Sequence, residues 1–283
     1  MLMAFVHTII TNPPGVNVLS LLIDSGVMEC VCAAFKAFEL HGAGAVAEAN
    51  VCLFFHLLLM LAPLDLTAPE AKPIVGQLLQ IPSSLKFVLD HNLDHVKGTG
   101  MTTAALCAQI CALVFGKQEE GFVFSDEQVD SLLVFTRDCF DGSLHKYFGL
   151  SPHWLKPIEA LCVSDANKTL LVKSPALVPL LLTALFLEAD HPRKGDVDAA
   201  LQAAIQTDAA NCFLQIAVFG PGREILAADG AVMGSLHALA DGGAITPEAK
   251  LSAAGAILAI EGRTHEIDGE RMQVSILVVL SGL

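Results

Sequence analysis

The stretch Leu21-Leu22-Ile23-Asp24-Ser25-Gly26-Val27 decides the fold, because variants of it occur twice more in the chain. They are Leu170-Leu171-Val172-Lys173-Ser174-Pro175-Ala176 and Ile225-Leu226-Ala227-Ala228-Asp229-Gly230-Ala231. Each copy ends a short apolar segment with Ser-Gly, Ser-Pro or Asp-Gly, and a second apolar segment begins directly afterwards. Such breaker pairs predict a tight connection between two helices. A connection that recurs in this way is typical of a helical repeat.

The turn residues in these copies lead to a specific expectation about backbone conformation. If Gly26 and Gly230 adopt the φ > 0 conformations that glycine permits, valine at either position destabilises the protein. The Asp or Ser beside each glycine is expected to cap the helix that follows, as these side chains commonly do.

The composition favours a helical protein with a large core. Hydrophobic residues make up 53% of the 283 residues and charged residues only 16%, against about 25% charged in ordinary globular domains. The apolar residues are mainly Leu, Ala and Val, with one Trp and one Tyr. Few large rings and many small aliphatic side chains suit closely packed helices better than a β-sandwich.

The charge pattern excludes one class of partner. The formal net charge is −14, and the sequence contains no basic stripe. Nucleic-acid binding normally depends on Lys and Arg that neutralise phosphates, so we expect no nucleic-acid partner.

Hydropathy and cysteine usage predict a cytoplasmic protein without a membrane span. The longest charge-free apolar stretches, 51–64 and 175–187, are shorter than the roughly 18–20 residues that cross a bilayer. The first ten residues lack the basic region of a secretory signal. The eight cysteines are spread through apolar stretches, which is typical of reduced thiols inside cells.

Helical periodicity dominates the chain, and local signals mark several helix ends. Ser125 and Gln128 have the spacing of a capping box, and Thr246-Pro247-Glu248 supplies an N-cap, an early proline and an early acid. Gly220-Pro221-Gly222 is interpreted as a turn between helices, and the β-branched run 274–280 could be a strand. The predicted helices cover about 27–40, 45–62, 69–79, 83–90, 101–115, 126–141, 152–161, 166–172, 175–187, 196–218, 223–228, 231–240 and 247–261.

The order of these segments resembles the armadillo repeat or a close HEAT-type relative. A long helix, a short helix, a Ser-Gly or Asp-Gly turn and a third helix match best at 167–187 and again at 222–240. In the family the short helix often carries an asparagine near its start, as Asn167 does here. The resemblance covers roughly two thirds of the chain, and its copies recur at uneven separations.

The resemblance implies an all-α fold, a right-handed α-α superhelix (armadillo-like solenoid) of about five to six irregular repeats. We expect this domain to occupy residues 1–262, with 263–283 a tail that could be the truncated start of a further domain. The implied function is a non-enzymatic scaffold, without cofactor or metal, that binds a protein or peptide partner on its concave surface. The alternative is a regulatory armadillo-like region of a larger signalling or enzymatic protein, for example one carrying a TIR domain.

Several residue groups are candidates for a metal, phosphate or redox site, and a structural interpretation is favoured for each. His91 and His95 are four residues apart, so a helix would place both on one face, and with Asp94 they could hold a metal. The spacing assigns no third ligand, and a solvated helix end is favoured. Lys97-Gly98-Thr99-Gly100 lacks the Gly-Lys-Ser/Thr order of a phosphate loop. A metal-dependent enzyme would have to retain a stoichiometric metal on purification. The cysteines at close spacing are interpreted as small core residues: Cys30, Cys32, Cys107 and Cys111.

Two further features allow both a functional and a structural interpretation. Asp138, Cys139 and His145 suggest a nucleophile with a nearby base, yet nothing in their spacing orients a base or an oxyanion donor. Trp154 fits a peptide anchor in a groove and ordinary helix packing equally well. The sequence therefore predicts no catalytic residue and names no binding residue.

Overall fold

The computed structural model describes residues 108, 109, 112, 123–141, 154–187, 191 and 197–262. Throughout these ranges the regular secondary structure consists of eight α-helices and one short π-helical turn, without a strand. The predicted all-α class is therefore confirmed for this part of the chain. The chain divides into two compact units between Phe135 and Thr136. The division lies within α8 (Asp126–Asp141), and the other described helices belong to the second unit.

Helix α8 begins with the predicted capping box. The backbone N–H of Ser125 donates to Oε1 of Gln128 over 2.9 Å, and the N–H of Gln128 donates to Oγ of Ser125 over 3.3 Å. Both residues thereby satisfy a donor that the first turn would otherwise leave unpaired. The helix ends at Asp141, where the sequence predicts its end.

The second unit contains helices whose bounds follow the sequence expectation within a few residues. Its longest member is α12, which packs on α9, α11, α13 and α15. The helices of this unit are α9 (Lys156–Leu161), α10 (Asp165–Lys173), α11 (Leu177–Leu185), α12 (Ala199–Ala217), α13 (Gly220–Ala228), α14 (Gly230–Ala238), η4 (Leu239–Gly243) and α15 (Pro247–Ile260).

Two expectations about turns are wrong. Gly220-Pro221-Gly222 forms the first turn of α13, where proline has no hydrogen bond to lose, and does not separate the helices. The chain leaves α12 at Val218 instead. Gly230 is the first residue of α14, and the only described residues with positive φ are Gly242 and Gly262. The expected φ > 0 at Gly230 is thus absent, and with it the reason to expect strain from valine there.

The predicted cap beside that glycine is confirmed. Asp229 ends α13 and caps α14, because its Oδ1 accepts from the N–H of Ala231 over 2.9 Å and from that of Val232 over 3.4 Å. The phrase at 225–231 therefore joins α13 to α14, and the phrase at 170–176 joins α10 to α11. The copy at 21–27 lies outside the described residues.

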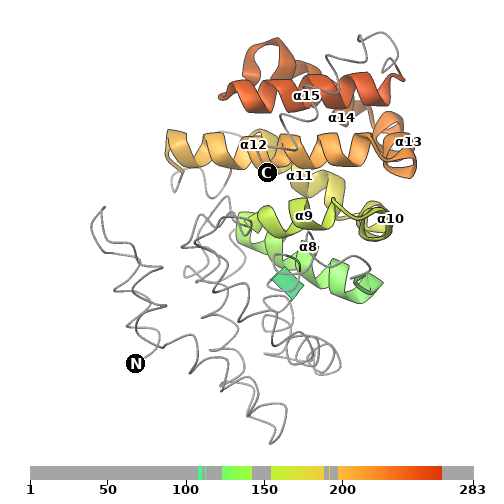
Figure 1. Ribbon diagram of the computed structural model, residues 1–283. Helices are drawn as coiled ribbons and strands as arrows, with labels where there is room; N and C mark the ends of the chain where they lie inside the picture. Colours follow the sequence, from blue (N-terminus) through green and yellow to red (C-terminus); the bar gives the residue numbers. More distant parts are fainter. Residues whose placement is uncertain are drawn as a thin grey trace, which may run out of the picture. The chain divides into compact units, whose positions relative to one another are not determined.

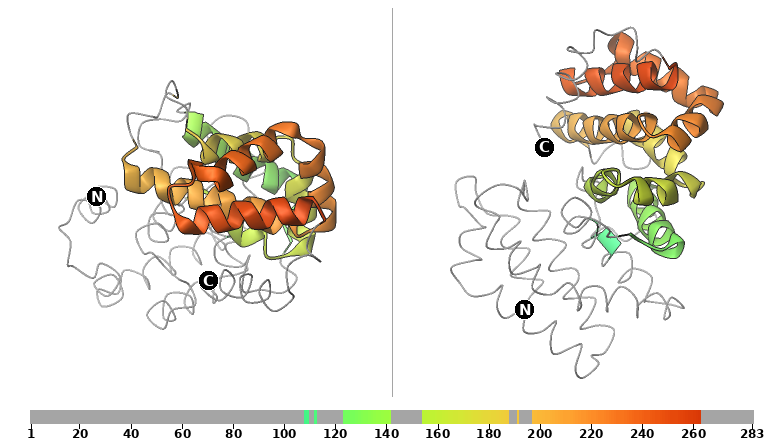
Figure 2. Two further views of the ribbon diagram at one scale, coloured as in Figure 1. Left: turned by 90° about the horizontal axis from the view of Figure 1, so that it is seen from above. Right: turned by 45° about the vertical axis from the view of Figure 1, so that its right-hand side comes forward.

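The helices of the second unit contact one another with a regular offset. Helix α9 packs on α12, α10 on α13, α11 on α14, and α12 on α15, so each contacts the helix three places further along the chain. Figures 1 and 2 show the two longest of these helices, α12 and α15, lying side by side. Short helices α13 and α14 connect them.

The core of this unit forms around α12. Ile205, Ala209 and Phe213 are fully buried, and Phe213 is one of the largest fully buried side chains among the described residues. Small residues on α15 allow that helix to come close: a Cβ added at Gly255 would lie 3.0 Å from Cδ1 of Leu214. Close contact between helices of this kind maximises dispersion contacts in the core.

No single helix among the described residues is both long and apolar enough to cross a bilayer. Helices α10 and α11 are long and apolar enough only when they are taken together, and the chain bends by 91° between them.

Candidate functional site

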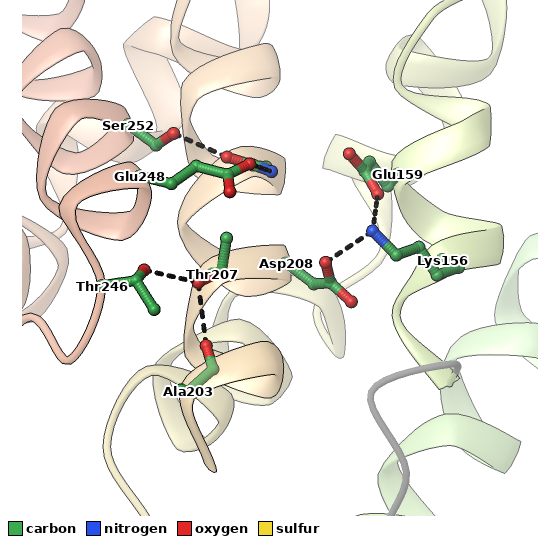
Figure 3. A network of polar contacts seen from close by, with 9 residues as sticks. Lys156, Glu159, Ala203, Thr207, Asp208, Thr246, Glu248 and Ser252 are labelled. Carbon is green, nitrogen blue, oxygen red and sulfur yellow. Dashed lines mark hydrogen bonds and ion pairs between the residues drawn. The ribbon is translucent and has the colours of Figure 1, made fainter. Parts of the chain in front are cut away.

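A band of polar side chains runs from α9 across α12 to α15 in the second unit. We call it the polar seam. Its α12 members are almost completely buried, and Figure 3 shows two of them, Thr207 and Asp208, between partners on α15 and α9. The polar seam consists of Lys156 and Glu159 from α9, Gln206, Thr207, Asp208 and Asn211 from α12, and Thr246, Glu248 and Ser252 at the start of α15.

The α9 side of the seam is a three-residue ion cluster. Nζ of Lys156 lies 3.0 Å from Oε2 of Glu159 and 2.7 Å from Oδ1 of Asp208. The two carboxylates are 3% and 4% exposed, whereas 41% of the Lys156 side chain is exposed. One ammonium group, reaching in from the surface, is therefore shared by two buried acids (Figure 3).

The second oxygen of Asp208, Oδ2, is buried and makes no hydrogen bond with the part of the chain that the structure describes. Burial raises the pKa of Asp208, Lys156 lowers it, and the charges of Glu159 and Glu248 raise it again, so that the pKa moves from 3.8 to about 7. For Lys156, burial alone would lower the pKa, but the charges and hydrogen bonds of Asp208 and Glu159 outweigh burial and raise it. The lysine is therefore charged at neutral pH, whereas Asp208 exchanges a proton near pH 7.

On the α15 side of the seam, two threonine hydroxyl groups form consecutive hydrogen bonds with a defined donor and acceptor in each. Oγ1 of Thr207 lies 2.8 Å from the carbonyl oxygen of Ala203, which can only accept. The Thr207 proton is therefore committed, and Thr246 must donate in the 2.8 Å contact between the two hydroxyls. Oγ1 of Thr246 in turn accepts from the N–H of Ala249 over 3.1 Å and so caps α15. These hydrogen bonds join the first turn of α15 to the backbone of α12 (Figure 3).

Two amide side chains complete the seam. Ser252 donates its hydroxyl to Oδ1 of Asn211 over 2.6 Å, and Nδ2 of Asn211 donates to Oε1 of Glu248 over 3.4 Å. Gln206 is fully buried and binds only backbone. Its Nε2 donates to the carbonyls of Leu185 and Gly243 over 3.0 and 3.2 Å, and its Oε1 accepts from the N–H of Ile245 over 2.7 Å.

The chemistry available in the seam is hydrogen bonding, charge pairing and proton exchange. Its groups are bonded mainly to one another and to nearby backbone. Within the described ranges, no group of three or more His, Cys, Asp or Glu side chains could hold a metal ion. The seam thus fixes how α9, α12 and α15 pack, and the pKa of its Asp208 lies close to neutral.

Two buried thiols lie beside the ion cluster. Cys162, which ends α9, and Cys212 of α12 are free and buried. A hydrogen bond with Cys162 raises the pKa of Cys212 well above its ordinary value, and burial raises it further. A thiol that keeps its proton is a poor nucleophile, so we assign Cys212 to the packing of α9 on α12.

The residues considered from the sequence do not assemble into a site in the described regions. Asp138 accepts from Arg137 over 2.9 and 3.1 Å, and Cys139 is buried. Trp154 is only 2% exposed, which favours packing over a groove anchor. The remaining candidates lie outside the described residues: Cys30, Cys32, His91, Asp94, His95, Lys97-Gly98-Thr99-Gly100, Cys107, Cys111 and His145.

Sequence reasoning missed the polar seam, although one signal was present. Asp208 is the only charged residue of α12, and it stands among Ala, Ile and Phe in an otherwise uncharged helix. An isolated acid on an apolar helix requires a partner if it is buried. Comparison of the chain with protein-family models, with curated proteins and with solved structures finds no match.

Proposed function

We propose that this chain forms an irregular armadillo-like solenoid and acts as a non-enzymatic protein-interaction scaffold. In this proposal α9, α12 and α15 occupy equivalent positions in successive repeats. Together they line a concave surface, and a peptide or partner domain binds there.

The observation that supports the repeat most directly is the offset of three helices in the contacts of the second unit. Helices α10 and α11 have 9 residues each and precede the 19-residue α12. Helices α13 and α14 again have 9 residues each and precede the 14-residue α15. Each of α10, α11 and α12 packs on its counterpart in the second triplet. Contacts between neighbouring units with the same internal order are what a solenoid requires.

The recurring phrase supports the same division into triplets. Its copies at 170–176 and 225–231 both lie at the connection between the first and the second short helix of a triplet. Equivalent sequence at equivalent positions favours a repeat over a chance arrangement of helices.

The surface of α15 supports a role in protein binding. Leu251 is 60% exposed, and Ala254 and Leu258, three and seven residues further on, are half-buried. Residues at this spacing share one helix face. An apolar face that stays partly open is typical of a site for another protein surface, and we assign it to the proposed binding surface.

The seam supports a scaffold over an enzyme. Its hydroxyl, amide and charged groups are engaged between helices. Seam residues of this kind hold repeat units together, and this leaves the surface of the long helices for recognition.

The test is partner capture with two matched variants of the full-length chain. Leu251→Asp places a charge on the proposed surface, whereas Ile225→Asp places one on α13, at an aliphatic residue that is also exposed (40%). Both variants should keep the helical circular dichroism and the thermal midpoint of the parent protein. We expect a specific partner that is lost with Leu251→Asp and retained with Ile225→Asp. A partner retained by Leu251→Asp, or the absence of any specific partner, would contradict the proposal.

A further inference from the structure

The ion cluster of the polar seam has more negative than positive charge. Among the described residues, Lys156 is the one cation that forms an ion pair with Glu159 and Asp208, and both carboxylates are nearly inaccessible to water. A buried carboxylate without full compensation is strongly disfavoured. The orphaned Oδ2 of Asp208 marks the place where compensation is missing.

The helices packed on α12 offer Asp208 no second cation. From α9, Lys156 and Glu159 act on it, and from α15 the carboxylate of Glu248 does. The other charged residue of α15, Lys250, is exposed to solvent and is not among the groups that shift the pKa of Asp208. Helix α11 has no titratable side chain. Helix α13, which follows the carboxyl end of α12, carries Arg223 and Glu224, and the remaining titratable neighbours are the Cys162 and Cys212 thiols. A proton on Asp208 is the simplest way to reduce the surplus negative charge.

We propose that Asp208 is a proton-controlled contact between α9 and α12, which holds the two helices together when protonated and loosens them when it ionises. The proton comes from and returns to solvent, so no other reactant is needed. This device is independent of the proposed scaffold function, because it concerns the packing of two helices and no partner.

The surroundings of Asp208 place the loss of its proton near neutral pH in the folded chain. Burial and the two neighbouring acids raise the pKa of Asp208 from 3.8 to about 7 against the opposing effect of Lys156. In an opened arrangement the carboxyl would be hydrated and its pKa would return towards its ordinary value. Between these two values the closed arrangement binds the proton more tightly, so rising pH favours opening until the closed form has also lost its proton.

The first test measures the titration of Asp208 in the full chain by ¹³C NMR of labelled aspartate carboxyl groups. We expect one signal with a midpoint near 7 that disappears in Asp208→Asn. Glu159→Gln should lower this midpoint, because Lys156 is then left to Asp208 alone, and Lys156→Met should raise it. A midpoint near the ordinary value of 3.8, or one that Glu159→Gln leaves unchanged, would overturn the proposal.

The second test measures whether the proton controls packing. Backbone hydrogen exchange of α9, corrected for the intrinsic pH dependence, should lose up to about tenfold protection per pH unit between pH 5 and 7 and then level off. Helix α14, which carries no partner of Asp208, serves as the internal reference. Asp208→Asn should make the protection of α9 independent of pH. If α9 in the parent protein keeps the same protection throughout, or if Asp208→Asn retains the pH dependence, the switch does not exist.

Discussion

Nζ of Lys156 lies 2.7 Å from Oδ1 of Asp208, and this ion pair joins α9 to the only charged residue of α12. The next contact in the series, between α12 and α15, is made mainly by hydroxyl and amide groups, as in Thr207–Thr246 and Asn211–Ser252. The two successive helix contacts thus depend on different chemistry: the first contains an ion pair, and the second consists of hydrogen bonds.

Removal of the shared cation should destabilise the protein. Lys156→Met leaves Glu159 and Asp208 buried together without a counter-ion. Breaking a fully buried pair costs about 3–5 kcal/mol, and we expect about 2–3 kcal/mol here, since 41% of the lysine side chain is exposed and screened by solvent. Urea unfolding at pH 7.5 measures the loss. Lys250→Met, at an exposed lysine of α15, should change the unfolding free energy by less than about 0.5 kcal/mol.

The stability should depend on pH through Asp208. Because its pKa is higher in the folded chain, about 7, than in the unfolded chain, about 3.9, folding binds a proton between these values. The stabilising contribution is complete below about pH 4 and is lost as pH rises through about 7. Asp208→Asn should therefore gain stability relative to the parent protein across this range, on the order of 2–4 kcal/mol in total. Paired urea titrations at several pH values measure the difference, and a difference that is flat with pH would contradict the assignment.

Local signals in the sequence were sufficient for much of the helical structure. The capping box of Ser125 and Gln128 and the cap of Thr246 were predictable because donor and acceptor lie within one turn. The same holds for Asp229, which both ends α13 and caps α14. Such interactions join residues that are close together in the sequence, so they can be predicted without knowledge of the tertiary fold.

The polar seam was not predictable in this way. Lys156 and Asp208 are separated along the chain by two complete helices, and nothing in either segment indicates which partner it finds. Gly222 shows a related difficulty. Its position beside a proline suggests a breaker, whereas in the structure it lies in a helix and is required by the close approach of Ile216. Both features follow from tertiary packing, which a single sequence does not encode locally.

Gly222 should not tolerate a side chain. A Cβ added there would lie 2.5 Å from the carbonyl oxygen of Ile216 and 2.7 Å from its Cγ2, so backbone would have to move. We expect Gly222→Ala to destabilise the protein by about 1–3 kcal/mol. Gly234→Ala is the matched control, because Gly234 lies inside α14 with open space around it; it should stabilise by about 0.5–1 kcal/mol. Thermal unfolding of both variants measures the contrast, and similar midpoints would show that the close approach to Ile216 is absent.

Gln206 should be the most sensitive uncharged residue of the seam. Gln206→Leu removes three hydrogen bonds and leaves the carbonyls of Leu185 and Gly243 and the N–H of Ile245 without this partner. A buried backbone group without a partner costs about 1–3 kcal/mol, so we expect a loss of about 2–4 kcal/mol in urea unfolding. Gln215→Leu, at a half-buried glutamine of the same helix, controls for the change of residue type and should be nearly neutral. Equal effects of the two variants would mean that the amide contacts contribute little.

Thr246 has two roles, and its substitution should cost more than the loss of a helix cap alone. Thr246→Ala removes both the cap on Ala249 and the hydroxyl that donates to Thr207. A cap is worth about 1 kcal/mol and a buried hydrogen bond about 1 kcal/mol, so the expected loss is about 2 kcal/mol. Asp229→Ala removes only the cap of α14 and should cost about half as much. Because the second role requires only a hydroxyl group, Thr246→Ser should restore most of the stability in chemical denaturation. A serine variant as unstable as the alanine variant would show instead that the threonine methyl group, and not the hydroxyl chain between α12 and α15, accounts for the effect.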